Sequence, residues 1–155
     1  QKDGGIWVDT DVVLLKKEKI NKDFIISDQG NGLINNAILK IPPNHKLLNR
    51  CINVCSNLKD NVTWGQTGPN LLTSAVKQFK LEEYLTPTYK TYPIAWQNWN
   101  WVFRPETCEM VREQTKYATY IHLWNEMIRN AQINKNLEPP EGSFIHKLFR
   151  INKIF

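Results

Sequence analysis

Two carboxylates interrupt an otherwise apolar stretch near the start of the chain. Asp9 and Asp11 lie between Ile6-Trp7-Val8 and Val12-Val13-Leu14-Leu15. In a strand, residues i and i+2 project to the same face, and burying both charges there costs several kcal/mol per charge unless something compensates. A divalent cation is the usual compensation, because hard cations take carboxylate oxygens. The pattern predicts either a metal site on a buried strand over residues 6–15 or two exposed turn aspartates between hydrophobic strands.

The length of 155 residues predicts a single domain with room for a core. Because the chain begins with Gln1 and reaches the acidic triplet within a few residues, we expect an N-terminal part to be missing. The hydrophobic share of 41% and the charged share of 23% are typical of a globular protein. No stretch approaches the roughly 20 apolar residues of a membrane span, and no signal peptide is visible.

The net charge of +5 favours a few partner classes and argues against others. Lys16-Lys17, Lys19 and Lys22 form a cluster, which indicates a solvated surface or a modest attraction to phosphate-bearing ligands or an anionic membrane. Nucleic acid is not expected as a partner, because no basic helix or base-reading motif accompanies the charge. Cys51 and Cys55 lie one helical turn apart and are expected in the core. The absence of CxxC pairs argues against a zinc site or a disulfide scaffold.

Strand-like and helix-like patterns alternate along the chain, which predicts an α/β fold. Apolar runs indicate buried strands over residues 6–15 and 33–41, and a further strand over 117–124, with 28–32 as a loop. Helices are expected from Asn44 to Cys55, from Pro69 to Phe79, from Pro105 to Val111 and from Ser143 to Phe149. Residues 84–103 are rich in proline and tryptophan without a clear period, so they are expected to be irregular with aromatic walls.

The loop Gly65-Gln66-Thr67-Gly68 directly precedes the helix that begins at Pro69. A glycine-containing loop at a helix N-terminus presents free N–H groups and the positive end of the helix dipole, so it predicts an anion site. A plain turn with a proline start explains the same residues.

Several other polar and aromatic residues admit both a structural and a functional reading. His122 lies in an apolar strand, where it is either a core residue or a third metal ligand beside the aspartates. Asn35 and Asn36 need partners for two buried amides, which backbone groups or sugar hydroxyls would supply. Trp96 and Trp99 serve either as packing residues or as a wall on which the apolar face of a sugar stacks.

Five groups of residues, spread from Gly4 to Asn125, resemble the characteristic segments of one enzyme family. They are similar, in the same order, to glycosyltransferases with a DXD sugar-binding region. Among these they resemble the alpha-1,4-galactosyltransferase (globotriaosylceramide synthase-like) group, in glycosyltransferase family 32. The matching groups are Gly4-Gly5-Ile6-Trp7-Val8-Asp9-Thr10-Asp11, Asn35-Asn36-Ala37, Trp64-Gly65 with Gly68-Pro69 and Leu71-Leu72-Thr73, Tyr92-Pro93-Ile94 with Trp96-Gln97 and Trp99, and His122-Leu123-Trp124-Asn125.

The resemblance implies that residues 1–155 form a single partial domain. This would be the C-terminal part of a glycosyltransferase A-type (Rossmann-like) domain that starts at the DXD strand, without its nucleotide-binding half. Two positions depart from the family pattern, in which an aromatic residue is usual at Asp3 and a tyrosine at Trp7. The implied activity is transfer of a galactose-like hexose from a UDP-sugar to a glycan or glycolipid acceptor, with retention and with Mn2+ or Mg2+. Association with a membrane surface is a further expectation.

The resemblance also implies roles for individual residues, each of which is an expectation. The metal ligands would be Asp9, Asp11 and His122, and Gln66 would face the reacting sugar as the catalytic residue. The remaining candidates are donor-binding residues, namely Gly4, Gly5, Asn35, Asn36, Gly65 and Gly68, and an acceptor wall of Trp96 and Trp99. No carboxylate in these motifs is placed as a nucleophile, unlike in two-carboxylate retaining glycosidases, and this favours a front-face reaction.

Two other functions compete with this interpretation. In a phosphatase of the haloacid dehalogenase type, Asp9 would be the nucleophile and Asp11 the acid/base, but the later acidic pair is lacking and Asp60 stands alone. A non-catalytic carbohydrate-binding fragment would keep the aromatic wall. Relatives of the resembled family occur in bacterial cytoplasm and in the Golgi lumen, and the scarcity of cysteine favours a membrane-associated protein of the bacterial cytoplasm.

Overall fold

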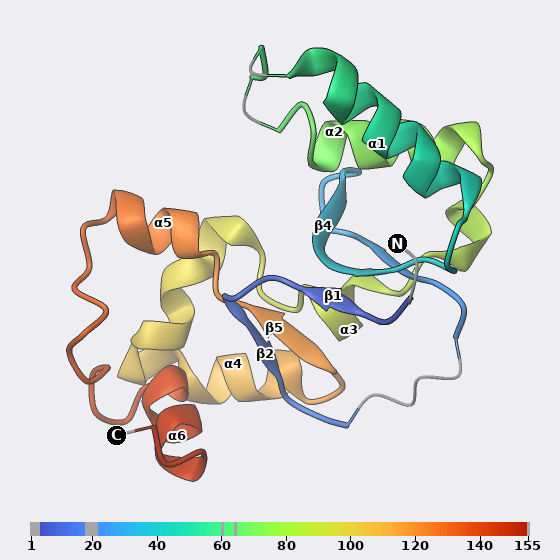
Figure 1. Ribbon diagram of the computed structural model, residues 1–155. Coiled ribbons are helices and arrows are strands. Elements are labelled where there is room, and N and C mark those ends of the chain that lie inside the picture. Colours follow the sequence, from blue (N-terminus) through green and yellow to red (C-terminus); the bar gives the residue numbers. More distant parts are fainter. Residues whose placement is uncertain (1–3, 18–21, 60, 64, 155) are drawn as a thin grey trace.

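The computed structural model describes residues 4–17, 22–59, 61–63 and 65–154. Five residues used in the sequence analysis lie outside the described ranges, namely Gln1, Asp3, Lys19, Asp60 and Trp64. Within those ranges, two small sheets and several short helices form two lobes (Figure 1). The mixture of helix and sheet agrees with the predicted α/β class, whereas the glycosyltransferase A-type assignment stays a prediction.

The two sheets are antiparallel and the chain passes from one to the other at the acidic triplet. The first sheet has the strand order β1-β4-β3, and the second pairs β2 with β5. The strands are β1 (Trp7–Val8), β2 (Val12–Leu14), β3 (Ile25–Asp28), β4 (Ile34–Lys40) and β5 (Tyr120–His122).

The predicted buried strand over residues 6–15 is wrong. The Val12 N–H donates to the Asp9 carbonyl at 3.1 Å, so a tight turn separates β1 from β2. Trp7 is 64% exposed, and Val8 is also exposed. The apolar residues on the two sides of the triplet therefore join different sheets, and the carboxylates are placed at the crossing.

The helices are α1 (Lys46–Leu58), α2 (Pro69–Gln78), η1 (Glu82–Tyr84), α3 (Thr88–Thr91), η2 (Trp96–Phe103), η3 (Pro105–Thr107), α4 (Cys108–Thr115), α5 (Asn125–Asn130) and α6 (Phe144–Ile151). The four predicted helices are confirmed with shifted ends. The expectation of irregular chain over residues 84–103 is wrong in part, because the short helix α3 and the 3-10 helix η2 occupy much of it. Strand β3 and helix α5 were not predicted. Both cysteines were expected in the core. Cys51 is half-buried and packs against the first apolar cluster, whereas Cys55 is exposed because α1 extends beyond that cluster.

Three apolar clusters hold the fold together. The first lies between α1, α2 and the β3–β4 pair, and includes Ile26, Leu47 and Leu72. The third lies among η2, α4, β5 and α6 in the other lobe. The second cluster joins the two sheets, because it contains Ile38 from β4 and Tyr120 from β5, with Tyr92 and Trp124 packed among them.

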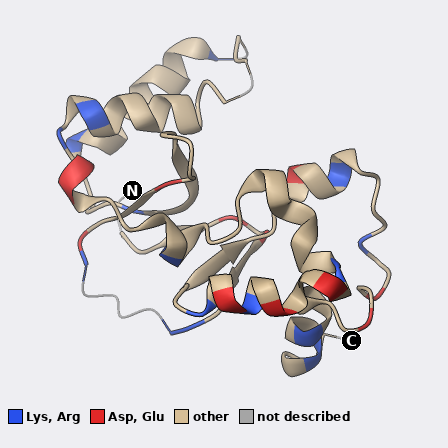
Figure 2. Cartoon of the chain, turned by 180° about the vertical axis from the view of Figure 1, so that it is seen from behind, with Lys and Arg blue, Asp and Glu red and all other residues tan. Residues whose placement is uncertain are grey.

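Charged residues are spread over the surface of both lobes. Figure 2 shows lysines and arginines on many elements with acidic residues between them. Exposed ion pairs such as Arg112–Glu109 at 3.0 Å and Arg129–Glu126 at 2.7 Å account for part of this pattern. Across the described ranges, no helix combines the length and the apolar character that crossing a membrane requires.

A buried hydroxyl joins α2 to β4. Thr73 Oγ1 accepts from the Ile34 N–H at 2.8 Å and donates to the Pro69 carbonyl at 2.7 Å. The Thr73 hydroxyl is the hydrogen-bond acceptor of the Ile34 N–H, because β4 faces α2 at this point. Thr73 therefore fixes the helix that follows the Gly65–Gly68 loop against the sheet.

We expect Thr73→Val to lower the free energy of unfolding by about 1–3 kcal/mol, because a buried N–H loses its acceptor while the side-chain shape is kept. Urea denaturation measures the change. Ser74→Ala, at the exposed next position of α2, is the control and should shift stability by less than about 0.5 kcal/mol. Equal effects of the two substitutions would contradict the role of this hydroxyl.

Candidate metal and sugar-nucleotide site

The turn that carries the two aspartates is bonded to both sheets. The Asp9 N–H donates to the Ala37 carbonyl of β4 at 2.8 Å. The Leu123 N–H donates to the Asp11 carbonyl at 2.9 Å, just beyond the end of β5. The position of each carboxylate is therefore set by a different sheet.

The structure brings Asp9, Asp11 and His122 together. A ligand atom from each of the three side chains lies within 4.8 Å of the other two. His122 reaches this position because it pairs with Val12 in the β2–β5 register, one residue after Asp11. Residues separated by more than a hundred positions thus meet at one turn.

Asp11 is the most firmly held of the three. Its Oδ2 lies 3.0 Å from His122 Nε2 and accepts from the Asn125 N–H at 2.8 Å. Burial acts to raise the pKa of the Asp11 carboxyl, but the hydrogen bonds from His122 and Asn125 and the attraction to His122 outweigh it and lower the pKa. The carboxylate form is therefore favoured in the folded protein.

Aromatic side chains form the floor beneath His122. The rings of His122 and Trp124 are 4.2 Å apart, and the indole N–H of Trp124 donates to the Ile94 carbonyl at 2.8 Å. The backbone of Trp124 is left-handed, at φ 54°. This conformation costs about 1–2 kcal/mol for a residue with a side chain. It turns the chain from β5 into α5, where the Asn125 N–H meets Asp11.

The donor set fits a hard divalent cation. Two carboxylates and one imidazole suit Mn2+, and the carboxylates also suit Mg2+. Ligand atoms on one Mg2+ lie at most about 4.2 Å apart, so small side-chain rotations would bring these three atoms into range. His122 Nδ1 is buried without a hydrogen-bond partner among the described residues. The other ring nitrogen, Nε2, faces Asp11, and a buried polar atom without a partner in a native protein is uncommon enough to need an explanation.

The two asparagines of β4 have different surroundings. Asn35 is buried, and its Oδ1 accepts from the Ala37 N–H at 2.7 Å and from the Tyr92 hydroxyl at 3.2 Å. Its amide group donates to Gln29 Oε1 at 2.6 Å. These bonds give Asn35 a structural role. Asn36 is half-buried and faces the Gly65–Gly68 loop, since a Cβ added to Gly68 would lie 3.1 Å from its Oδ1.

The Gly65–Gly68 loop is stabilised largely by bonds within itself. Gln66 Oε1 accepts from the Thr63 N–H at 2.9 Å. The Gln66 N–H donates to the Thr63 carbonyl and the Gly68 N–H to the Gly65 carbonyl. These two amides are therefore engaged in this structure, and the predicted anion role of the loop stays a prediction.

The glycine pair and the two tryptophans of the predicted wall have different surroundings. Gly4 and Gly5, at φ 69° and 99°, border a shallow groove beside Leu39, Ile41 and Leu48. A Cβ on Gly4 would lie 3.0 Å from Pro43, so the close approach explains a glycine there. Trp96 is 39% exposed, whereas Trp99 packs against Phe103 and the central apolar cluster. Trp96 alone of this pair presents a largely open ring.

Two residues that contact the cluster were not predicted as site residues. The Trp7 indole N–H donates to Asp9 Oδ1 at 2.7 Å. Tyr92 lies with its ring 5.9 Å from that of His122, and its hydroxyl accepts from the Ile38 N–H at 3.2 Å. Side chains alternate along an extended chain, so Trp7 and Asp9 lie on one face, and this spacing could have predicted their contact. Nothing in the sequence pairs Tyr92 with His122.

Comparison with known proteins identifies the family. The sequence model described as "Alpha 1,4-glycosyltransferase conserved region" matches residues 40–152. The chain belongs to this family. The match includes the Gly65–Gly68 loop and His122, and it begins downstream of Asp9 and Asp11.

Named relatives agree with this assignment. The chain is similar to rat lactosylceramide 4-alpha-galactosyltransferase, with 30% identity over 84% of the chain and 39% of the relative. It is 27% identical to the human protein of the same name, over 79% of the chain and 38% of the relative. Human alpha-1,4-N-acetylglucosaminyltransferase is 28% identical over 80% of the chain and 39% of the relative. The chain thus spans about two fifths of the length of these curated relatives. No solved structure matches it.

The lowered pKa of Asp11 predicts how stability depends on pH in the metal-free protein. A carboxyl with a depressed folded-state pKa contributes stability that is present above its ordinary pKa of about 4 and is lost as the pH falls through the lowered value. In chelator, the stability deficit of Asp11→Asn should therefore be largest near neutral pH and shrink below about pH 4. Urea denaturation across this range measures it, with exposed Asp23→Asn as the control. A deficit that is constant with pH would contradict the assignment.

Proposed function

We propose that this chain is part of a metal-dependent, retaining glycosyltransferase that moves a galactose-like hexose from a UDP-sugar to a glycan or glycolipid acceptor. The observation that carries the proposal is the convergence of Asp9, Asp11 and His122 in a chain of the alpha 1,4-glycosyltransferase family. The names of the relatives, a lactosylceramide galactosyltransferase and an N-acetylglucosaminyltransferase, support sugar transfer as the reaction class.

In this proposal the cluster binds Mn2+ or Mg2+ through Asp11, Asp9 and His122. When bound, such a cation neutralises the diphosphate charge that grows as the glycosidic bond breaks. Asp11 is suited to this role because its carboxylate form is favoured. Trp7 and the Asn125 N–H hold the two carboxylates in position through their hydrogen bonds.

The other residues would bind and orient the sugars. Gln66 and the Gly65–Gly68 loop would face the donor sugar from beside Asn36, and Trp96 would stack on an acceptor ring. Among the described residues, no carboxylate joins Asp9 and Asp11 in the cluster as a separate nucleophile. This supports a front-face reaction, in which the acceptor hydroxyl attacks from the side of the departing diphosphate. A covalent glycosyl adduct trapped on any residue would overturn it.

The alternatives have unequal support. None of the relatives named above is a phosphatase, and His122 rather than a further carboxylate completes the cluster. A non-catalytic carbohydrate-binding fragment is the main alternative. An activity assay of the full-length protein distinguishes it from a transferase. A location in the bacterial cytoplasm stays a prediction.

The decisive experiment is a donor screen on the full-length protein with and without Mn2+. UDP-galactose, UDP-glucose and UDP-N-acetylglucosamine are offered with lactosylceramide or a free lactoside, and UDP release and product anomer are measured. Asp11→Asn should reduce the Mn2+-dependent rate by more than about 100-fold, which exceeds the roughly 10- to 100-fold effect of second-shell residues. Asp23→Asn, an exposed carboxylate outside the cluster, should retain the wild-type rate.

Each result has a defined meaning. Full Mn2+-dependent activity of Asp11→Asn would show that the metal assignment is wrong. No transfer and no nucleotide-sugar hydrolysis by the wild-type protein with any donor would favour the non-catalytic alternative.

The bond between Trp7 and Asp9 generates a separate prediction. Trp7→Phe removes the indole donor but keeps an aromatic ring, so Mn2+ affinity should fall about 10-fold. Isothermal titration calorimetry measures this affinity. Trp96→Phe makes the same change at another exposed tryptophan and should leave Mn2+ binding unchanged. An equal loss in both variants would mean that Trp7 does not act through Asp9.

A further inference from the structure

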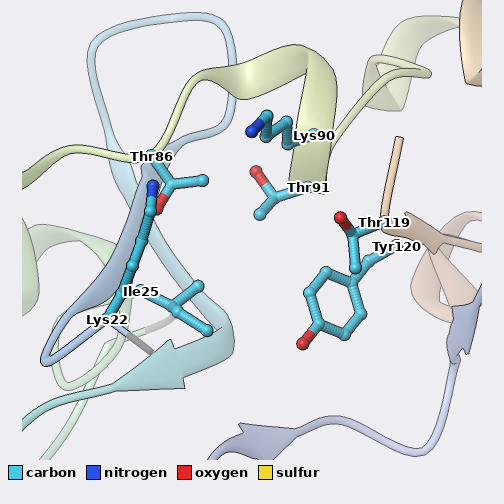
Figure 3. A pocket seen from close by; sticks show the side chains of 7 residues that line it. All are labelled: Lys22, Ile25, Thr86, Lys90, Thr91, Thr119 and Tyr120. Atoms are coloured by element: carbon cyan, nitrogen blue, oxygen red, sulfur yellow. The ribbon is translucent and has the colours of Figure 1, made fainter. Parts of the chain in front are cut away.

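A second polar pocket lies where the two sheets meet, at the other end of β5 from His122. Seven residues line it, namely Lys22, Ile25, Thr86, Lys90, Thr91, Thr119 and Tyr120. In Figure 3, Lys22, Ile25 and Thr86 stand on one side, Thr91, Thr119 and Tyr120 on the other, and the Lys90 amine extends between them. Thr119 precedes His122 by three residues, which is about 10 Å along a strand. The pocket is therefore separate from the carboxylate cluster.

The described residues give this pocket a positive charge. None of the lining residues that the structure describes is acidic. Within the described ranges, the amines of Lys22 and Lys90 form no ion pair. The backbone at Lys22 is held by Lys40, whose amine donates to the Lys22 carbonyl at 2.6 Å. Two lysines that line one small concave site give it a positive potential that favours an anion.

Thr86 supplies an independent sign of a ligand. Its side chain is 8% exposed, and its Oγ1 is buried with no hydrogen-bond partner among the described residues. The Thr86 N–H donates to the Ile26 carbonyl at 2.7 Å, so the residue is fixed in place. Native proteins rarely leave a buried hydroxyl unsatisfied. Thr86 also lines the same pocket as Lys22 and Lys90, so a side-chain rotation would bring this hydroxyl to the ligand.

We propose that this pocket binds a phosphate group. Both amines and the Thr86 hydroxyl are donors, and phosphate offers several strong acceptor oxygens at a charge that matches the two lysines. The source is either inorganic phosphate or the headgroup of an anionic lipid, which present the same chemistry. A bound phosphate would connect residues from both sheets, because Ile25 belongs to β3, Tyr120 to β5 and Lys90 to α3. The inference does not rest on the proposed transferase function.

The test measures phosphate binding to the full-length protein in chelator, so that the carboxylate cluster plays no part. Inorganic phosphate should raise the melting temperature saturably, whereas chloride at equal ionic strength should not. Lys22→Gln and Lys90→Gln should each weaken phosphate affinity at least about 10-fold, since each removes a charge-assisted hydrogen bond. Lys77→Gln, which removes the same charge from an exposed position of α2, should bind phosphate as the wild type does.

Thr86→Val is the second variant, for the case that a lysine variant fails to fold. It should weaken phosphate affinity without lowering the melting temperature in phosphate-free buffer, because it removes a hydroxyl that has no partner. A purely structural threonine would instead lose stability without affecting phosphate binding.

Vesicle flotation distinguishes the two sources. Phosphatidylcholine vesicles containing phosphatidic acid should retain the wild type but not Lys90→Gln if the ligand is a lipid headgroup, and inorganic phosphate should compete. Phosphate binding without vesicle retention identifies the free anion. The proposal is overturned if the wild type shows no saturable phosphate binding, or if the pocket variants bind phosphate as tightly as Lys77→Gln.

Discussion

The contact between Asp11 and His122 connects the two halves of this structure. Asp11 ends the turn that leaves the first sheet, and His122 ends the strand that closes the second. Their side chains lie 3.0 Å apart, with the Asn125 N–H on the same carboxylate oxygen. A partly buried carboxylate requires such partners, because its desolvation would otherwise be unfavourable. The position of the crossing, the start of α5 and the carboxylate cluster all follow from this requirement.

Around this contact, hydrogen bonds add to the apolar packing of the cluster that joins the two sheets. Tyr92 is buried beside His122. Its hydroxyl donates to Asn35 Oδ1 and accepts from the Ile38 N–H, and both of these residues belong to β4. Trp124 is fixed by a backbone carbonyl rather than by packing alone. Hydrogen bonds of this kind fix side-chain orientation more tightly than apolar contacts do. The same bonds that hold the sheets together therefore orient the aspartates and the histidine.

The helices were the more predictable part of the fold. The apolar positions of α1 and α2 recur at helical spacing, and Pro69 fixes where α2 begins. The strands around the triplet were not predictable in the same way, because Ile6 to Leu15 is apolar enough for one buried strand. This stretch becomes two strands only because its first part pairs with β4 and its last part pairs with β5. Cys55 shows that helical spacing has the same limit. Spacing places Cys55 on the apolar face of α1, but it does not show which part of that face is buried.

The sequence by itself placed two carboxylates in an apolar stretch, where either a cation or exposure at a turn would compensate their charge, and its motif order pointed to a family that the comparisons then confirmed. It also offered His122 as a third ligand, although it could not exclude a core histidine. Tertiary structure decided which residues meet. It gave Asn35 a structural role, packed half-buried Trp99 against the central apolar cluster, and brought Trp7 and Tyr92 to the three-residue cluster. The physical reason is that local patterns fix periodicity and charge, whereas partners far apart in the chain depend on strand register, which long-range pairing alone sets.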